Sequence, residues 1–349
     1  MRIFFFHEDL IYPFDEGIKK TAEQFRKHFS QKHDVLTFTR FAPAGIPGDV
    51  QPIRTNKLLI SRKLAAAVGK FRPDVMVYLP SASGTPASFL RMKIMHGYYP
   101  SARRVMILLQ PKRIPGIFQF LVSSSRPDLI LSPSFAVAEE LEFMPVKFRL
   151  MPLFTDQSIF KAATDNTARK KIRKQNDLPL GKFIILHTGH LNWGRNLEAL
   201  IPLQTDDQQV LIISSTSTPG DAPAEKKLRQ RLINSGIIIR DSYQEKIAAI
   251  YQACDLYVFP VTFPGGSIGL PLSILEARAC GLPVVTTRFG SLEHFLGKSD
   301  KGVFFSSPDN FPATVATIRG SNQNWTDNSI DSLNREYHEV LDNMMARLD

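Results

Sequence analysis

Residues 260–283 read PVTFPGGSIGLPLSILEARACGLP, which has the features of a strand end, a glycine-rich turn and a helix in succession. The apolar run 256–259 before it has the length of a buried strand. Glycines within 265–269 let backbone N–H groups approach a ligand, because glycine has no side chain in the way. The helix begins near Pro271 and stops at Gly281. Since a helix N-terminus attracts negative charge, this turn is expected to bind an anion.

Glu276 lies inside the expected helix, where a carboxylate beside a bound nucleotide would accept hydrogen bonds from ribose hydroxyls. If the same carboxylate faced solvent, it would carry no function. The letters SILEA at 273–277 and ACGLPVV at 279–285 closely resemble the nucleotide-binding signature of family-4 glycosyltransferases. Those are retaining enzymes of the two-domain GT-B fold, and they usually carry Met where this chain has Arg278.

The length of 349 residues suits two domains, each able to bury its own core. Short apolar runs alternate with helical patterns along the chain, which indicates doubly wound, mostly parallel sheets. With the resemblance, the expected fold is α/β: a GT-B architecture of two Rossmann-like domains facing a central cleft. We expect an acceptor-side domain at 1–160, a nucleotide-sugar domain at 161–326, and a final helix at 327–349 that packs back on the first domain.

Composition argues against several classes of protein. No apolar run approaches the roughly 20 residues of a membrane-spanning helix. Cys254 and Cys280 suit small buried residues in a reducing compartment better than a disulfide or a metal site. We therefore expect a cytoplasmic protein with no metal and no cofactor beyond its donor substrate.

Positive charge is concentrated in the first half of the chain. Residues 1–150 hold 22 Lys plus Arg and 12 Asp plus Glu, a net charge of +10, whereas residues 151–349 hold 21 of each. Such asymmetry points to an anionic partner, which could be a membrane surface, a lipid phosphate, an acidic glycan or a nucleic acid, and a solvated basic surface is the plain alternative. A nucleic-acid partner is not expected, because the basic residues lack interleaved aromatic residues for base stacking.

Residues 112–122, KRIPGIFQFLV, place two cations beside a run rich in Phe and Ile. A core helix with basic residues at its start is the first expectation, because an apolar stripe at helical spacing usually belongs to a core. A surface element that lays its apolar face among lipid head groups is the alternative.

The resemblance implies two positions on the acceptor side. Relatives have a glycine-bearing loop after the first strand, and Gly17 occupies that place. Many relatives have a histidine after the strand near 104–109, where this chain has Gln110. A glutamine can hydrogen-bond a sugar hydroxyl but exchanges no proton near neutral pH, so it cannot replace a histidine as an acid or base.

Residues 183–198, FIILHTGHLNWGRNLE, give a second signal: a buried strand, a turn at Gly189 and the start of a helix near Asn196. Relatives place an Arg and a Lys on the donor diphosphate here, and His190 and Arg195 match those positions. Arg195 keeps the positive charge and can grip phosphate through its planar fork. Further on, relatives contact the nucleobase through the backbone around the positions of Arg240 and Tyr243.

Taken together, the resemblance implies metal-independent transfer of a sugar from a nucleotide diphosphate to a hydroxyl of a glycan or lipid-linked acceptor, with retention of configuration. Arg195 and His190 would act on the leaving diphosphate with the N–H groups of Gly265, Gly266, Ser267, Ile268 and Gly269, while Glu276 would hold the ribose. One position departs from the family, because relatives usually carry a glutamate where this chain has Ile268. Two alternatives follow: a non-catalytic homologue that binds a partner subunit, and a nucleotide-sugar epimerase.

Overall fold

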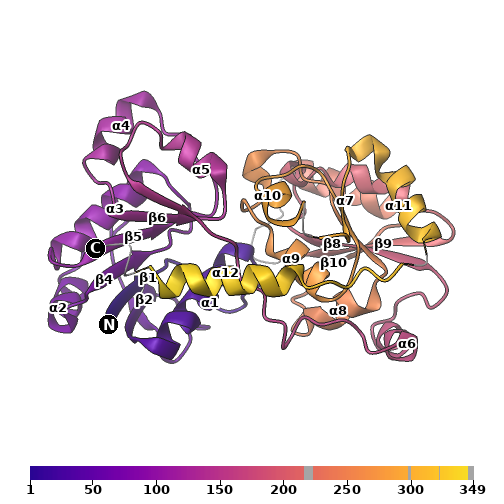
Figure 1. Cartoon of the computed structure of the whole chain (residues 1–349), viewed down its shortest axis with the longest axis horizontal. Helices are drawn as coiled ribbons and strands as arrows, with labels where there is room; N and C mark the ends of the chain where they lie inside the picture. The colour runs from indigo at the N-terminus through magenta and orange to yellow at the C-terminus, as the bar shows by residue number, and fades with distance from the viewer. Residues whose placement is uncertain (216–222, 298–299, 322, 345–349) are drawn as a thin grey trace. The chain divides into compact units, whose positions relative to one another are not determined.

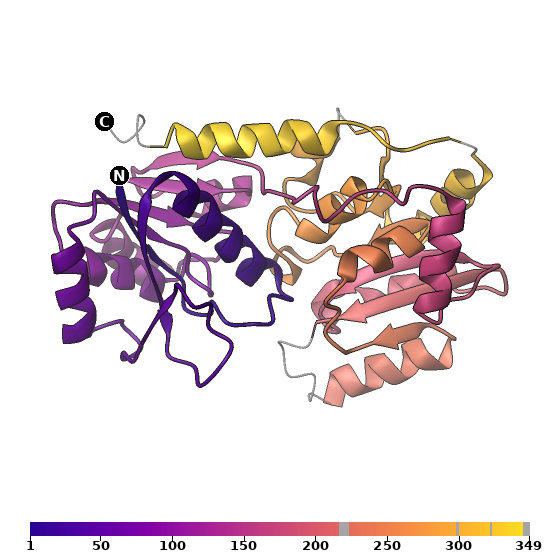
Figure 2. The same cartoon turned by 90° about the horizontal axis from the view of Figure 1, so that it is seen from below.

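The computed structural model of the chain describes residues 1–215, 223–297, 300–321 and 323–344 (Figures 1 and 2). Contacts divide the chain into two units. The first unit comprises Met1–Leu153, Ile268–Leu270 and Glu336–Asp349, and the second comprises Phe154–Ser267 and Pro271–Arg335. This division by contacts does not test the domain limits expected at residues 160 and 326, which stay predictions.

The first unit is built on a parallel sheet of seven strands in the order β3-β2-β1-β4-β5-β6-β7. Its central strands are short apolar runs that are buried on both faces, as in Phe4, Phe5 and Phe6 of β1. The strands are β1 Arg2–Phe6, β2 Asp34–Arg40, β3 Gln51–Ile53, β4 Val75–Tyr78, β5 Arg103–Ile107, β6 Leu129–Ser132 and β7 Lys147–Leu150.

Helices of the first unit connect these strands. Side chains fix where two of them begin: Ser61 accepts a hydrogen bond from the N–H of Leu64, and Thr85 accepts one from the N–H of Ser88. The helices are α1 Gly17–Lys32, α2 Arg62–Phe71, α3 Pro86–Gly97, α4 Gly116–Ser123 and α5 Phe135–Glu140.

The second unit repeats the plan with six parallel strands in the order β10-β9-β8-β11-β12-β13. The strands are β8 Phe183–Gly189, β9 Gln208–Ser214, β10 Ile238–Arg240, β11 Leu256–Phe259, β12 Val284–Thr286 and β13 Val303–Phe305. The helices are α6 Asn166–Gln175, α7 Pro223–Asn234, α8 Ile247–Ala253, α9 Leu272–Ala279, α10 Leu292–Leu296 and α11 Phe311–Gly320, with the short 3₁₀ turns η1 Trp193–Arg195, η2 Leu197–Leu203, η3 Pro264–Gly266 and η4 Pro308–Asn310. Two doubly wound parallel sheets confirm the expected fold class.

The segment after β8 differs from the expectation of a helix entered near Asn196. It forms η1 and η2, and Asn196 between them has a left-handed backbone, with φ of 53°. Pro202 inside η2 has no N–H and would clash with the preceding turn of an α-helix, so the tighter 3₁₀ turn is the accessible form.

Helix α4 is not the core helix that its apolar sequence first suggested. Val122 is its one buried residue, whereas Ile117 and Phe120 are 83% and 86% exposed. Ile114 and Val122 are the residues of this segment that join the buried core of the first unit, whereas Ile117 and Phe120 stay outside it.

The last helix, α12 Ser329–Asp342, is divided between the units after Arg335. Its second half packs on α1 within the first unit: the ring of Tyr337 lies 5.5 Å from that of Phe25, and the imidazoles of His28 and His338 stack at 5.0 Å. Residues 345–349, which the sequence placed in this helix, lie outside the described residues.

Candidate active site

The order of the second sheet reverses between β8 and β11, which are adjacent and parallel. Helices that follow such strands leave in opposite directions, and the crevice at the carboxyl ends of the two strands is where ligands bind doubly wound sheets. The loop after β8 carries His190 and Arg195, and the loop after β11 carries the glycines near 266. The sheet topology therefore brings the two sequence signals to one place.

Arg195 lies directly against the turn that ends β8. A Cβ atom added to Gly189 would be 2.9 Å from Nη1 of Arg195, and Gly189 has a φ of 147°, which side chains rarely allow. The guanidinium carbon also lies 6.0 Å from the centre of the Phe259 ring, at the end of β11. Only 9% of Arg195 is exposed, so its cation is held in a fixed position between the two strand ends.

The two loops meet at their glycines. A Cβ on Gly266 would be 2.3 Å from the carbonyl oxygen of Gly194, so only glycine permits this approach of one backbone to the other. Phe263 covers Gly194 and Gly265, with its ring within 4 Å of the positions where these glycines would carry a Cβ. Arg195 and the glycine turn are thus parts of one surface of the second unit.

Glu276 is buried, with 4% of its surface exposed, and is connected to the end of β8 by hydrogen bonds. The hydroxyl of Tyr251 lies 3.0 Å from Oε2 of Glu276 and 3.0 Å from Oγ1 of Thr188. Burial and the nearby Glu276 raise the pKa of Tyr251 well above 10. The tyrosine therefore stays protonated, and its hydroxyl donates a hydrogen bond to Glu276. Thr188 precedes Gly189, and the carboxylate is thereby positioned relative to the strand end that contacts Arg195.

Two histidines of β8 and its loop have different surroundings. His187 is fully buried and shares a hydrogen bond of 2.9 Å with the carbonyl of Val258. Burial, with a smaller contribution from the nearby Arg195 cation, lowers the pKa of His187 to about 3, so this imidazole is neutral at physiological pH. His190 is half-buried beyond the strand end, on the same loop as Arg195.

Residues 268–270 belong to the first unit, although they follow the glycine turn directly. A Cβ on Gly17 would be 3.2 Å from Cδ1 of Ile268, so the isoleucine fills the space over the start of α1. The N–H of Gly269 donates to the carbonyl of Leu109 at 2.8 Å, which engages one amide of the turn. Within the turn, the second unit therefore contains Gly265, Gly266 and Ser267.

The other expected residues lie at strand ends. Arg240 ends the edge strand β10, and its guanidinium donates to the carbonyl of Asn176, while Tyr243 is 48% exposed in the next loop. Gln110 follows β5 in the first unit, where its N–H donates to Oγ of Ser83 at 3.1 Å. The guanidinium of Arg240 and the backbone N–H of Gln110 are thus both engaged in hydrogen bonds within the protein.

Glu8 was not among the expected residues. It follows β1 at the point where the order of the first sheet reverses, between β1 and β4. Its carboxylate is 3% exposed and accepts hydrogen bonds from the hydroxyl of Tyr78, from Ser81 (N–H at 3.0 Å), and from Nη1 of Arg91 at 3.1 Å. The sequence signal was available, because a carboxylate directly after a buried parallel strand lies at the ligand-binding edge.

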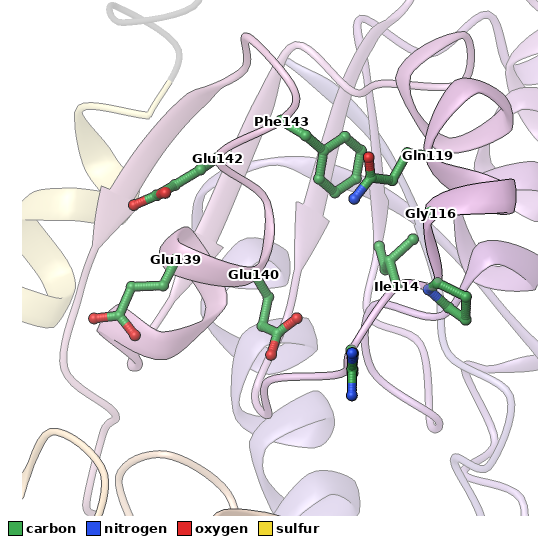
Figure 3. A pocket seen from close by; sticks show the side chains of 9 residues that line it. Ile114, Gly116, Gln119, Glu139, Glu140, Glu142 and Phe143 are labelled. Carbon is green, nitrogen blue, oxygen red and sulfur yellow. The ribbon is translucent and has the colours of Figure 1, made fainter.

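The first unit also has an open groove of about 500 Å³ between α4 and α5 (Figure 3). Its walls are polar, with a single guanidinium and three carboxylates, over an apolar floor. The lining residues are Arg113, Ile114, Pro115, Gly116, Gln119, Glu139, Glu140, Glu142 and Phe143.

Two kinds of feature are absent from the described residues. No group of three or more His, Cys, Asp or Glu side chains is placed to hold a metal ion. Within the same ranges, no helix has the length and apolar character that crossing a bilayer requires.

Comparison with known proteins places this surface in a family context. Residues 183–320 match the family described as "Glycosyl transferases group 1". The chain is 24% identical to sulfoquinovosyl transferase SQD2 of Arabidopsis thaliana over 75% of its own length and 52% of that protein. It is also 24% identical to TuaC of Bacillus subtilis (strain 168), which is named for teichuronic acid biosynthesis, over 80% of this chain and 70% of that one. The chain thus spans about half the length of SQD2.

A solved structure with the same architecture is that of Anabaena HepE (Alr3699), determined in complex with UDP and glucose. It superposes with a TM-score of 0.76 over 99% of this chain and 98% of that one, at 16% sequence identity. Similarity at this identity shows that the two proteins share the GT-B fold. Together with the family match, it confirms the resemblance to GT-B glycosyltransferases first carried by residues 273–285, while membership of family 4 and retention of configuration stay predictions.

Proposed function

We propose that this chain, a GT-B protein with a glycosyl transferases group 1 domain at residues 183–320, transfers a sugar from a nucleotide diphosphate to a hydroxyl of a glycan or lipid-linked acceptor. The transfer proceeds with retention of configuration and without a metal ion. The nucleotides in the HepE structures make a uridine diphosphate sugar the first donor to test.

One observation carries this proposal: the Arg195 cation is fixed against Gly189 beside the glycine contact between Gly194 and Gly266. When the bond between sugar C1 and the diphosphate oxygen breaks, negative charge gathers on the diphosphate while the sugar becomes cationic. A preorganised guanidinium and nearby N–H groups stabilise that developing charge without a further rearrangement. His190 lies on the same loop and supplies a further hydrogen bond to the diphosphate.

Glu276 is assigned to the ribose of the donor, as the resemblance implies. Its connection through Tyr251 and Thr188 to the end of β8 supports this role, because it fixes the carboxylate relative to the loop that carries Arg195. Arg240 and Tyr243 are assigned to the nucleobase side, and Gly17 and Gln110 to the acceptor side.

The test is Arg195→Ala, assayed for sugar transfer and for donor hydrolysis. Removing one such donor is expected to lower kcat by about 100- to 1,000-fold. The matched control is Arg231→Ala, which removes an exposed arginine of the same unit that pairs with Glu198. Near-normal turnover in Arg195→Ala, with the control also normal, would contradict the assignment.

A non-catalytic partner-binding subunit is the second candidate, and Ile268 favours it. Where relatives usually carry a glutamate, this side chain is apolar and packs on Gly17. Calorimetry with nucleoside diphosphates followed by a hydrolysis assay separates the two: binding without transfer or hydrolysis supports the subunit. Rearranged product from donor alone would instead reveal an epimerase.

We further place the reaction on the cytoplasmic side, at an anionic membrane surface that the first domain contacts. The net charge of +10 in residues 1–150 supports this location. Nucleic acid is not among the proposed partners.

A further inference from the structure

Helix α4 has an apolar face that nothing in the described chain covers. Phe120 and Ile117, at 86% and 83%, are the most exposed large hydrophobic side chains among the described residues, and they lie three positions apart on one face of the helix. Phe118, which lies between them in the same turn, is 40% exposed. Single exposed hydrophobic residues are ordinary on protein surfaces, whereas adjacent ones on one helix indicate a binding surface.

Positive charge surrounds this face. Residues 75–127 contain seven Lys plus Arg and no Asp or Glu. Lys112 and Arg113 are exposed immediately before α4, Arg126 is exposed after it, and Lys93 is exposed on α3, which packs beside α4. A partner for this face must therefore accept both apolar side chains and cations.

The carboxylates nearby lie on a different side of the helix. Gly116 and Gln119 line the groove that Glu139, Glu140 and Glu142 border, and Ile117 and Phe120 do not. Figure 3 shows Gln119 directed toward Phe143 across the groove, with the three glutamates on the opposite wall. The helix thus presents a polar face to the groove and an apolar face away from it.

We propose that α4 docks on the surface of an anionic lipid bilayer, with Ile117 and Phe120 inserted among the acyl chains. Lys112 and Lys93, which do not line the groove, then lie at the level of the lipid phosphates. Partitioning that combines apolar insertion with electrostatic attraction is stronger than either alone. A second copy of the chain fits this face less well, because self-association would bring the same cations together.

This docking rests on the proposed function only for its purpose, which is to hold the enzyme beside a lipid-linked acceptor. Vesicle binding and sugar transfer are separate measurements. If vesicles bind but no sugar is transferred, the proposed function fails and the docking stands. If a water-soluble acceptor is glycosylated while vesicles do not bind, the docking fails and the function stands.

The experiment is co-sedimentation of the full chain with vesicles of phosphatidylglycerol and phosphatidylcholine, compared with phosphatidylcholine alone. The wild type is expected to bind the anionic vesicles and to be released by high salt. The double variant Ile117→Ser/Phe120→Ser is expected to lose at least about 10-fold in binding, because it removes the inserted apolar area. Lys93→Gln/Lys112→Gln is expected to weaken binding to anionic vesicles only.

The matched control is Ile60→Ser, which removes a 54%-exposed isoleucine just before α2 in the same unit and should bind vesicles as the wild type does. Phe120→Trp adds a direct readout: its emission should shift to the blue with anionic vesicles, while that of Ile60→Trp should not. The proposal is overturned if the double variant binds like the wild type, if the wild type binds neither vesicle, or if Phe120→Trp shows no shift. Sedimentation without vesicles that reveals a dimer dependent on Ile117 and Phe120 would also overturn it.

Discussion

Gly189 determines where the cation of Arg195 lies. Its φ of 147° and its 2.9 Å approach to the guanidinium leave no room for a side chain. A larger residue would both strain the turn and push the end of a flexible arginine aside. The second effect matters for binding, because the charge would move away from the glycine contact at Gly266.

Gly189→Ala is therefore expected to weaken binding of nucleoside diphosphates by roughly 10- to 100-fold, the loss that a charge-assisted hydrogen bond of about 1.5–3 kcal/mol implies. It should also cost about 1–3 kcal/mol of stability through backbone strain. Calorimetry measures the first effect and denaturant unfolding the second.

Gly236→Ala is the matched control, since Gly236 has a φ of 89° in the same unit and the atoms nearest its added Cβ, at 3.6 Å, belong to the side chain of Gln204. It should lose similar stability but keep its affinity. Equal affinity in both variants would show that the position of Arg195 does not depend on Gly189.

Sequence alone predicted part of this arrangement. Arg195 and the glycines could be paired because parallel strands place their following loops at one sheet edge. The Tyr251–Glu276 contact could not, since it joins residues of α8 and α9 whose facing sides depend on packing. For the same reason, the packing of Ile268 on Gly17 could not be predicted from the sequence.

At the scale of elements, α9 is fixed by a buried arginine. Nε of Arg278 lies 2.7 Å from Oδ2 of Asp300, and both side chains are at most 1% exposed. The same guanidinium donates to the carbonyls of Leu282 and Trp325 and pairs with Asp327 at 3.1 Å. The helix that carries Glu276 is thereby tied to the loop before β13 and to the segment before α12.

Replacing this arginine by the Met usual in relatives, Arg278→Met, should destabilise the protein by about 3–5 kcal/mol, because the Asp300 carboxylate would be left buried without its partner. Arg319→Met is the control: its pair with Asp207 is exposed, and its loss should cost at most about 1 kcal/mol. Denaturant unfolding gives both values. A loss below about 1 kcal/mol for Arg278→Met would mean that Asp300 finds another partner or protonates without cost.

Elements were predictable where their residues are buried on both sides. The apolar runs of β1, β4, β8 and β11 stand out in the sequence, whereas β3 has three residues with Pro52 among them, and β7 reads KFRL. Such short edge strands form because a neighbour offers hydrogen bonds, and their own side chains do not reveal it. The exposure of α4 was mispredicted for a related reason: periodicity shows that a face is apolar but not what covers it.

Across the whole molecule, buried histidines set the response to acid. Burial lowers the pKa of His7, of His28 to about 4, and of His187 to about 3. Below the ordinary value of 6.5, the unfolded chain binds protons that these folded sites exclude. The free energy of unfolding should therefore be highest above pH 6.5 and fall as the pH drops toward 4.

The melting temperature is thus expected to be lower at pH 5 than at pH 7.5, a range in which most carboxylates stay charged. His28→Gln should reduce that drop. His28 is buried beside His338, Asp342 and Lys32, and protonating it in the folded state costs free energy. His294→Gln, at an exposed position, should leave it unchanged. An equal drop in all three proteins would assign the acid response to other groups.

The division of α12 has a consequence for how the protein is made. Residues 336–344 complete the first unit by covering Phe25 and neighbouring side chains of α1, yet the ribosome adds them after the entire second unit. Part of the apolar surface of α1 therefore stays uncovered until translation has passed residue 344. During that interval the nascent chain is a natural client for chaperones that shield apolar surface.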